Sequence, residues 1–244
     1  MKKIHKGIVK TIKEAAKNTV YMSFEPENPM EIKPGQFISI LCGGLTLRRP
    51  FSAADFDGKE IAILFRRKGK GTNYLSGLKP GSEIDFIGAL GNGFDVVDKK
   101  SLIIGAGIGI APVSYLKKKL DSGILVGAFM SKDEAPQGIS FDEIITNDGS
   151  AGKKGSILDH LENLIDNYKP EIIYACGPAV VLRAVGEAAQ RHGADSQLAM
   201  EKVMACGIGV CKGCVIKVKR GGEINNMTVC SDGPVFRGSE VLWE

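Results

Sequence analysis

The chain has 244 residues, of which 43% are hydrophobic and 25% are charged. This length allows one large domain or two to three small ones, each with its own apolar core. The formal net charge of +4 is small and spread along the chain, so it gives no support for nucleic-acid binding, which needs a concentrated basic face. No stretch approaches the roughly 18 apolar residues of a membrane span, and we expect no membrane segment.

The basic N-terminus and the cysteine content both bear on the compartment. No apolar run follows the N-terminal lysines, so we expect no signal peptide. Two of the six cysteines, Cys42 and Cys176, lie too far apart in sequence to suggest a disulfide framework. A reducing cytoplasm is the compartment that this pattern favours.

The first 98 residues are typical of an antiparallel β-barrel. Short segments rich in β-branched or aromatic residues alternate with Pro, Gly and Asn, without long helices between them. We expect strands at 4–12, 19–24, 36–41, 60–66 and 83–87.

From residue 101 onward, apolar strands alternate with helical segments, which predicts a parallel sheet with crossover helices. The expected strands are 101–104, 123–130 and 171–174, and the expected helices are 111–120, 157–168 and 179–192. We therefore predict three domains: a barrel at 1–98, an α/β domain at 99–197, and a small C-terminal domain at 198–244.

Four cysteines dominate the C-terminal segment. Their C-x4-C-x2-C…C spacing is the plant-type pattern of ligands to a [2Fe–2S] cluster, and glycines between them allow tight turns. The four residues are Cys206, Cys211, Cys214 and Cys230. A structural zinc and disulfides are the alternatives, but zinc sites with four cysteines usually have two short paired spacings.

Two motifs of the barrel segment suit a phosphate-bearing ligand. Arg49, Pro50, Phe51 and Ser52 place a guanidinium, a ring and a hydroxyl together at the start of a predicted strand, and an arginine fork matches a diphosphate. A surface arginine beside a core phenylalanine is the alternative. The basic loop at 66–75 carries glycines before a helical turn that starts at Thr72. Backbone N–H groups there can bind an anion, although a solvated basic loop has the same pattern.

A third motif follows the strand at 102–104. Gly105, Gly107 and Gly109 open the helix that contains Pro112, which is the context for a dinucleotide phosphate at a helix N-terminus. Ile110 occupies the place of the last glycine of G-x-G-x-x-G, so a plain strand-to-helix turn is the alternative. Cys176-Gly177-Pro178 ends another strand, at the sheet edge where ligands of α/β proteins gather.

The order of these motifs resembles that of the ferredoxin reductase-like flavoproteins. With the four cysteines and Asp232-Gly233-Pro234-Val235-Phe236, nearly the whole chain is similar to the electron transfer subunits of class B dihydroorotate dehydrogenases. The resemblance implies FAD in the barrel, NAD on the α/β domain and a [2Fe–2S] cluster near the C-terminus.

The resemblance also implies roles for single residues. FAD would be held by Arg49, Pro50, Phe51, Ser52, Gly71 and Thr72, with Phe51 replacing the tyrosine that is frequent in the wider family. NAD would lie against Gly107, Gly109, Cys176 and Gly177. The cluster would be ligated by Cys206, Cys211, Cys214 and Cys230.

The chain carries no convincing acid, base or nucleophile set, so no catalytic residue is assigned. A flavin that converts between electron pairs and single electrons would explain this, because the protein then only positions and tunes cofactors. The resemblance implies a catalytic partner that carries FMN on a (β/α)8 barrel, oxidises dihydroorotate, and forms a heterotetramer of two plus two chains. The alternatives are a flavin subunit of a ferredoxin-dependent NADP+ reductase or sulfide dehydrogenase complex, and a zinc-binding module without enzymatic activity.

Overall fold

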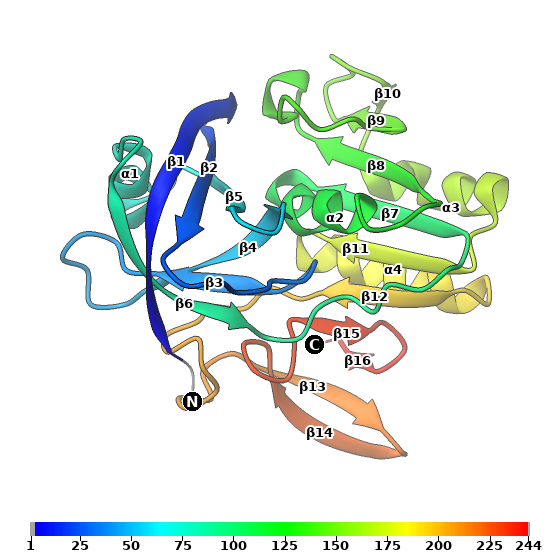
Figure 1. The fold of residues 1–244 in the computed structure, drawn as a ribbon. Helices are drawn as coiled ribbons and strands as arrows, with labels where there is room; N and C mark the ends of the chain where they lie inside the picture. Colours follow the sequence, from blue (N-terminus) through cyan, green and yellow to red (C-terminus); the bar gives the residue numbers. More distant parts are fainter. Residues whose placement is uncertain (1–2, 244) are drawn as a thin grey trace.

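The computed structural model describes residues 3–243 and contains a closed six-stranded barrel, a seven-stranded sheet and a three-stranded sheet. Figure 1 shows the barrel beside the large sheet, with the C-terminal strands below both. The predicted combination of an antiparallel barrel and a parallel-sheet domain is confirmed. No helix among the described residues is both long and apolar enough to span a membrane.

The barrel is antiparallel throughout and is closed in the order β1-β2-β5-β4-β3-β6. Its strands are β1 (Ile4–Ala16), β2 (Thr19–Pro26), β3 (Phe37–Ile40), β4 (Arg49–Phe56), β5 (Ile61–Arg66) and β6 (Glu83–Leu90), and helix α1 (Lys70–Ser76) follows β5. Apolar side chains such as Phe24, Ile38 and Phe86 fill the interior without solvent exposure. Closure leaves no free sheet edge in the barrel.

The large sheet has the strand order β10-β9-β8-β7-β11-β12-β15. Its parallel strands are β7 (Ser101–Ala106), β8 (Ile124–Phe129), β9 (Glu143–Thr146), β10 (Lys153–Lys154), β11 (Ile172–Cys176) and β12 (Asp195–Ala199). The helices are η1 (Gly107–Gly109), α2 (Ile110–Lys117), η2 (Lys132–Glu134), α3 (Ile157–Tyr168) and α4 (Ala179–Arg191). Because helices cover both faces, β7 is buried along its whole length.

The two faces of the sheet have different helical cover. Ile103 belongs to the apolar cluster that includes Val113 of α2. Its neighbour Leu102 points to the opposite face and belongs to the cluster that includes Leu161 of α3 and Val185 of α4. This alternation along β7 explains why the strand is a continuous apolar run.

The C-terminal segment belongs to two sheets. Strands β13 (Val215–Arg220), β14 (Glu223–Thr228) and β16 (Val241–Leu242) form the small sheet in the order β14-β13-β16. Strand β15 (Val235–Arg237) instead pairs antiparallel with β12 at the edge of the large sheet. The boundary expected between 197 and 198 falls inside β12, and the domain limits remain a prediction.

Polar contacts join the barrel to the large sheet. The Tyr115 hydroxyl donates to the carbonyl oxygen of Ile32 at 2.9 Å in a buried position. At the turn between β1 and β2, the Lys17 amide donates to the carbonyl oxygen of Asp133 at 2.8 Å. These contacts fix the junction at which the predicted nucleotide motifs meet.

Candidate cofactor-binding site

The two predicted phosphate motifs of the barrel lie against each other. Arg49 begins β4, and Gly71 is buried in the first turn of α1. A Cβ atom added to Gly71 would lie 3.2 Å from Cγ of Arg49 and 3.4 Å from Cβ of Cys42. A side chain at position 71 would therefore press on the arginine, so glycine here lets the loop and the guanidinium stem approach closely.

Thr72 shapes the loop from within. Its hydroxyl oxygen accepts hydrogen bonds from the amides of Lys68 at 2.9 Å and Gly69 at 3.1 Å, and α1 begins at Lys70, two residues before the predicted start. The Thr72 hydroxyl thus organises the backbone that precedes the helix. Any ligand contact of Thr72 remains a prediction.

Phe51 lies in the barrel core and is 9% exposed. Its ring centroid is 5.5 Å from that of Phe65 on β5, with a tilted arrangement of the rings. Ser52 points to the other side of the strand and is half-buried. Phe51 and Ser52 therefore point to opposite sides of β4, as the alternation along a strand predicts. Stacking of Phe51 on a flavin stays a prediction.

The two predicted nucleotide motifs of the large sheet are also in contact. Cys176, the last residue of β11, is the partner of Gly105 across the ladder. A Cβ atom added to Gly109 would lie 2.3 Å from the carbonyl oxygen of Cys176 and 2.7 Å from the amide nitrogen of Gly177. Only glycine fits at this approach, because real Cβ atoms do not come so near to backbone. The glycines at 105, 107 and 109 thus form a tight turn at the carboxyl ends of β7 and β11, although their spacing departs from G-x-G-x-x-G.

Cys176 is a protonated thiol at neutral pH. Burial raises its pKa to about 12, and the nearby carboxylate of Glu201 adds to the shift. Its side chain is therefore a neutral, weakly polar surface beside the glycine turn rather than a thiolate nucleophile.

Arg66 is a functional candidate whose approach to the large sheet was not predicted from the sequence. It was grouped with the basic loop of the barrel, but a Cβ atom on Gly107 would lie 3.7 Å from its Nη2 atom. The same nitrogen forms an ion pair with Glu134 of η2 at 2.6 Å. Arg66 thus carries a positive charge from the end of β5 to the predicted dinucleotide turn. Only the barrel–sheet packing reveals this.

The four cysteines come together in two pairs. The amide of Cys211 lies 3.4 Å from Sγ of Cys206, and the amide of Cys230 lies 3.4 Å from Sγ of Cys214. The Gly209 amide donates to Sγ of Cys230 at 3.1 Å, which ties the loop to the last cysteine. Amide donors directed at sulfur favour the anionic thiolates that a cluster requires.

The pairing of the sulfurs bears on the kind of metal site. Two pairs of thiols match a two-iron cluster, in which each iron takes two protein ligands. The donor set therefore fits the predicted cluster.

The cysteine loop touches the barrel beside its predicted flavin residues. A Cβ atom added to Gly207 would lie 3.6 Å from the Ser39 hydroxyl oxygen. Ser39 of β3 is in turn the ladder partner of Pro50 on β4. The loop therefore packs against the strand pair that contains the Arg49–Ser52 motif.

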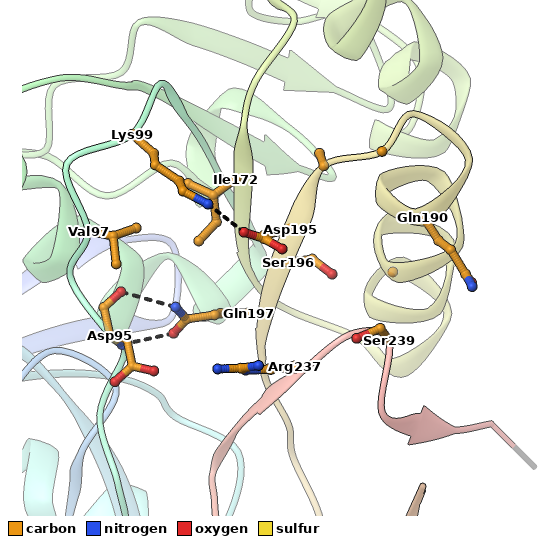
Figure 2. Close-up of a pocket in the computed structure, with 13 residues that line it drawn as sticks. Asp95, Val97, Lys99, Ile172, Gln190, Asp195, Ser196, Gln197, Arg237 and Ser239 are labelled. Atoms are coloured by element: carbon orange, nitrogen blue, oxygen red, sulfur yellow. Dashed lines mark hydrogen bonds and ion pairs between the residues drawn. The ribbon is translucent and has the colours of Figure 1, made fainter. Parts of the chain in front are cut away.

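Another described cavity lies elsewhere. A cavity of about 420 Å³ is lined by Asp95, Lys99, Asp195, Gln197 and Arg237 among others, and Figure 2 shows these side chains around the start of β12. It faces the amino ends of β11 and β12, whereas the glycine turn lies at their carboxyl ends. The cavity is thus separate from the predicted nucleotide site.

Comparisons with known proteins agree with this arrangement. The family model of the iron-sulfur cluster binding domain of dihydroorotate dehydrogenase B matches residues 201–242. A solved structure of an NADH-dependent reduced ferredoxin-NADP oxidoreductase superposes with a TM-score of 0.82 at 27% identity, covering 97% of this chain and 90% of that one. A ferredoxin NADP+ reductase from Neisseria gonorrhoeae has the same fold, with a TM-score of 0.61 at 17% identity over 79% of this chain and 93% of that one.

The fold and the cysteine domain define a ferredoxin reductase-like oxidoreductase that transfers electrons. The electron transfer subunit of dihydroorotate dehydrogenase B (NAD(+)) from Caldanaerobacter subterraneus is 40% identical, covering 86% of this chain and 87% of the relative. The corresponding subunit from Desulforamulus reducens is 32% identical over the full length of both chains. The chain belongs to this family of dihydroorotate dehydrogenase B electron transfer subunits. The three cofactors predicted from the sequence, FAD, a [2Fe–2S] cluster and NAD, are thereby confirmed.

Proposed function

We propose that this chain carries electrons from an FMN-containing catalytic subunit, which oxidises dihydroorotate, to NAD+ in pyrimidine biosynthesis. One observation above all supports the proposal: the loop with Cys206 lies against Ser39 of β3, through the approach of Gly207, and β3 pairs with the strand β4 that contains Arg49 and Ser52. An electron that arrives at the cysteines is then next to the flavin-binding strands. Bound FAD supplies the conversion between the single electrons of an iron–sulfur cluster and the electron pair of a nicotinamide.

The barrel motifs are proposed to hold FAD. Arg49 would bind the diphosphate through its planar fork, with Gly71 leaving room for this side chain. Thr72 would keep the preceding loop in shape through its bonds to the amides of Lys68 and Gly69. Pro50, Phe51 and Ser52 would line the flavin side of β4.

The glycine turn is proposed to hold NAD. Gly107 and Gly109 would let the dinucleotide approach the start of α2, where backbone N–H groups favour a phosphate. Cys176 and Gly177, which touch Gly109, would lie near the nicotinamide. A neutral thiol at Cys176 would leave the charge of the ring undisturbed.

The cysteine loop is proposed to be the site at which the catalytic partner docks and exchanges electrons. Cys211 is exposed, whereas Cys214 and Cys230 are buried, so the site has one side open to another protein. We propose a heterotetramer of two such chains and two FMN-containing subunits, in the cytoplasm. Native mass spectrometry of the co-expressed subunits measures this stoichiometry directly.

The assay of first choice is an anaerobic absorption spectrum of the purified chain before and after addition of NADH, with iron and flavin measured in the same sample. We expect flavin bands and a broad cluster absorbance, both bleached by NADH. Dihydroorotate should bleach them only when the catalytic subunit is present. A colourless, zinc-containing protein would refute the proposal.

A second candidate function rests on the structural match to the NADH-dependent reduced ferredoxin-NADP oxidoreductase, which covers nearly the whole chain. In that case the partner would be a flavoprotein that works with ferredoxin and NADP. Reduction of the cluster by dihydroorotate in a mixture with the catalytic subunit distinguishes the two, because the second candidate predicts no such reduction.

A further inference from the structure

Asn92 connects the end of the barrel to the segment that follows Cys230. It lies two residues after β6 ends at Leu90. Its Nδ2 atom donates to the carbonyl oxygens of Asp232 at 3.2 Å and Val235 at 3.0 Å, and its Oδ1 atom accepts from the Val235 amide at 3.0 Å. Its own amide donates to the carbonyl oxygen of Gly233 at 2.6 Å. One exposed residue thus makes four hydrogen bonds, all of them to residues 232–235.

The surrounding backbone is packed closely enough to make this contact specific. A Cβ atom on Gly91 would lie 2.6 Å from the carbonyl oxygen of Gly233 and from Cδ of Pro234. The carbonyl oxygen of Gly91 accepts a hydrogen bond from the Gln36 side chain at 2.8 Å, which fixes the barrel side of the junction. The segment at Gly91 is therefore fixed on one side by the barrel, through Gln36, and on the other by the backbone of Gly233 and Pro234.

The junction leads to the flavin strands in one direction. Leu90 pairs with Phe37 of β3, and Phe37 pairs with Ser52 of β4. Two ladder steps thus join Asn92 to the strand face that is proposed to hold FAD.

In the other direction the junction leads to a cysteine. The carboxylate of Asp232 accepts from the Thr228 amide at 2.7 Å and from the Thr228 hydroxyl at 2.8 Å, which closes the turn that contains Cys230. The backbone bonded by Asn92 is therefore rigidly connected to a cluster ligand.

We infer that Asn92 is a positioning residue that sets the separation between the flavin side of the barrel and the cluster, and thereby the rate of electron transfer between them. The inference rests on the proposed function. Electron transfer slows steeply as two redox centres move apart, so a junction that holds the two parts at a fixed spacing controls the rate without touching either centre. Asn92 lies in neither the predicted FAD site nor the predicted NAD site.

The test uses the full chain with its FAD and cluster, in complex with the catalytic subunit. The complex is mixed rapidly with NADH under anaerobic conditions, and flavin reduction and cluster reduction are followed separately by absorbance and by freeze-quench EPR. For Asn92→Ala we expect unchanged flavin reduction and NADH KM but measurably slower cluster reduction, because the three side-chain hydrogen bonds that hold residues 232–235 to the end of the barrel are lost. Hydrogen exchange at the Val235 amide should accelerate, because its acceptor is gone.

Gln197→Ala is the matched control. The Gln197 side chain accepts from the amide of Asp95 at 2.8 Å and donates to its carbonyl oxygen at 3.1 Å, as Figure 2 shows. Both of these side-chain hydrogen bonds go to Asp95 and neither goes to residues 232–235, so Gln197 holds the same linker to β12 by a different route. We expect this variant to lose stability but to keep the wild-type rate of cluster reduction.

Each remaining outcome decides the question. Wild-type cluster reduction in Asn92→Ala, or equal slowing in Gln197→Ala, would overturn the positioning role while leaving the proposed function intact. If Asn92→Ala loses its cluster, Asn92→Ser is the milder variant, because its hydroxyl can still form a hydrogen bond and places no charge against the carbonyl oxygens of Asp232 and Val235. Cluster loss in this variant as well would overturn the positioning role. A wild-type cluster that NADH does not reduce would refute the proposed function instead.

Discussion

At the scale of single residues, the approach of Gly109 to β11 gives the sharpest prediction. Gly109→Ala would place a methyl group 2.3 Å from the carbonyl oxygen of Cys176, so the turn must open. Overpacking of this kind costs about 1–3 kcal/mol of folding stability, and the opened turn no longer presents its backbone N–H groups to a phosphate in the same geometry. We expect the Kd for NADH, measured by titration of the flavin absorbance, to rise while FAD and iron content stay unchanged.

Gly77→Ala is the control for that variant. Gly77 has φ −89° and would bring its Cβ atom no closer than 3.5 Å to a neighbour, which is an ordinary contact. NADH affinity should stay at the wild-type value. Wild-type affinity in Gly109→Ala as well would show that the turn does not bind the dinucleotide.

The thiol of Cys176 provides a prediction about pH. Because burial raises its pKa to about 12, it stays protonated at pH 8, and only a thiolate reacts rapidly with iodoacetamide. We expect alkylation of Cys176 in the folded chain, followed by mass spectrometry, to be far slower at pH 8 than in the denatured chain and to keep accelerating beyond pH 9 for as long as the chain stays folded. A rate that reaches its plateau near pH 9 would show that the thiol is not shielded.

At the scale of elements, the end of α3 carries a strained residue. Lys169 follows the helix with φ 50° and ψ 61°, and its amide donates to the carbonyl oxygen of Ile165 at 2.7 Å. A side chain in this left-handed conformation costs about 1–2 kcal/mol, which glycine avoids. We expect Lys169→Gly to raise the melting temperature by about 2–4 °C for each kcal/mol recovered, whereas Lys169→Ala should leave it unchanged. A lower melting temperature for the glycine variant would mean that flexibility of the unfolded chain outweighs the relief.

Elements with a strong local pattern were predictable from the sequence, and those set by distant pairing were not. The buried runs of β7 and β11 were found because an apolar segment between turns has few other interpretations. Strand β12 begins with Asp195, Ser196 and Gln197, and such polar residues give no strand signal. It forms because β11 on one side and β15 on the other complete its hydrogen bonds.

The residues of the candidate site likewise divide into those that a local sequence pattern predicted and those that only the packing of distant segments reveals. The cysteine spacing predicted the cluster ligands because all but one of them lie within nine residues. The position of Arg66 was missed because it depends on how the barrel packs on the large sheet. No local pattern links Arg66 to Gly107, which is 41 residues away in sequence.

At the scale of the whole molecule, the barrel and the large sheet meet where the dinucleotide is proposed to bind. Arg66 reaches from β5 to the Gly107 turn and is held there by Glu134. The ion pair is partly exposed, with Arg66 at 38% and Glu134 at 22%, so by itself it adds little stability. Its more important effect is to hold a guanidinium beside the proposed position of a diphosphate.

Replacing Arg66 therefore tests whether this side chain contributes to binding of the dinucleotide or to the stability of the fold. Arg66→Ala removes a charge-assisted donor worth about 1.5–3 kcal/mol, and we expect the KM for NADH to rise about ten- to a hundredfold with little change in melting temperature or iron content. Glu134→Gln is the informative companion, because it removes the ion pair but leaves the guanidinium. If the arginine acts on the dinucleotide, Glu134→Gln should keep most of the affinity and Arg66→Ala should lose it. Equal losses in both variants would instead show that the ion pair matters by joining the barrel to the sheet.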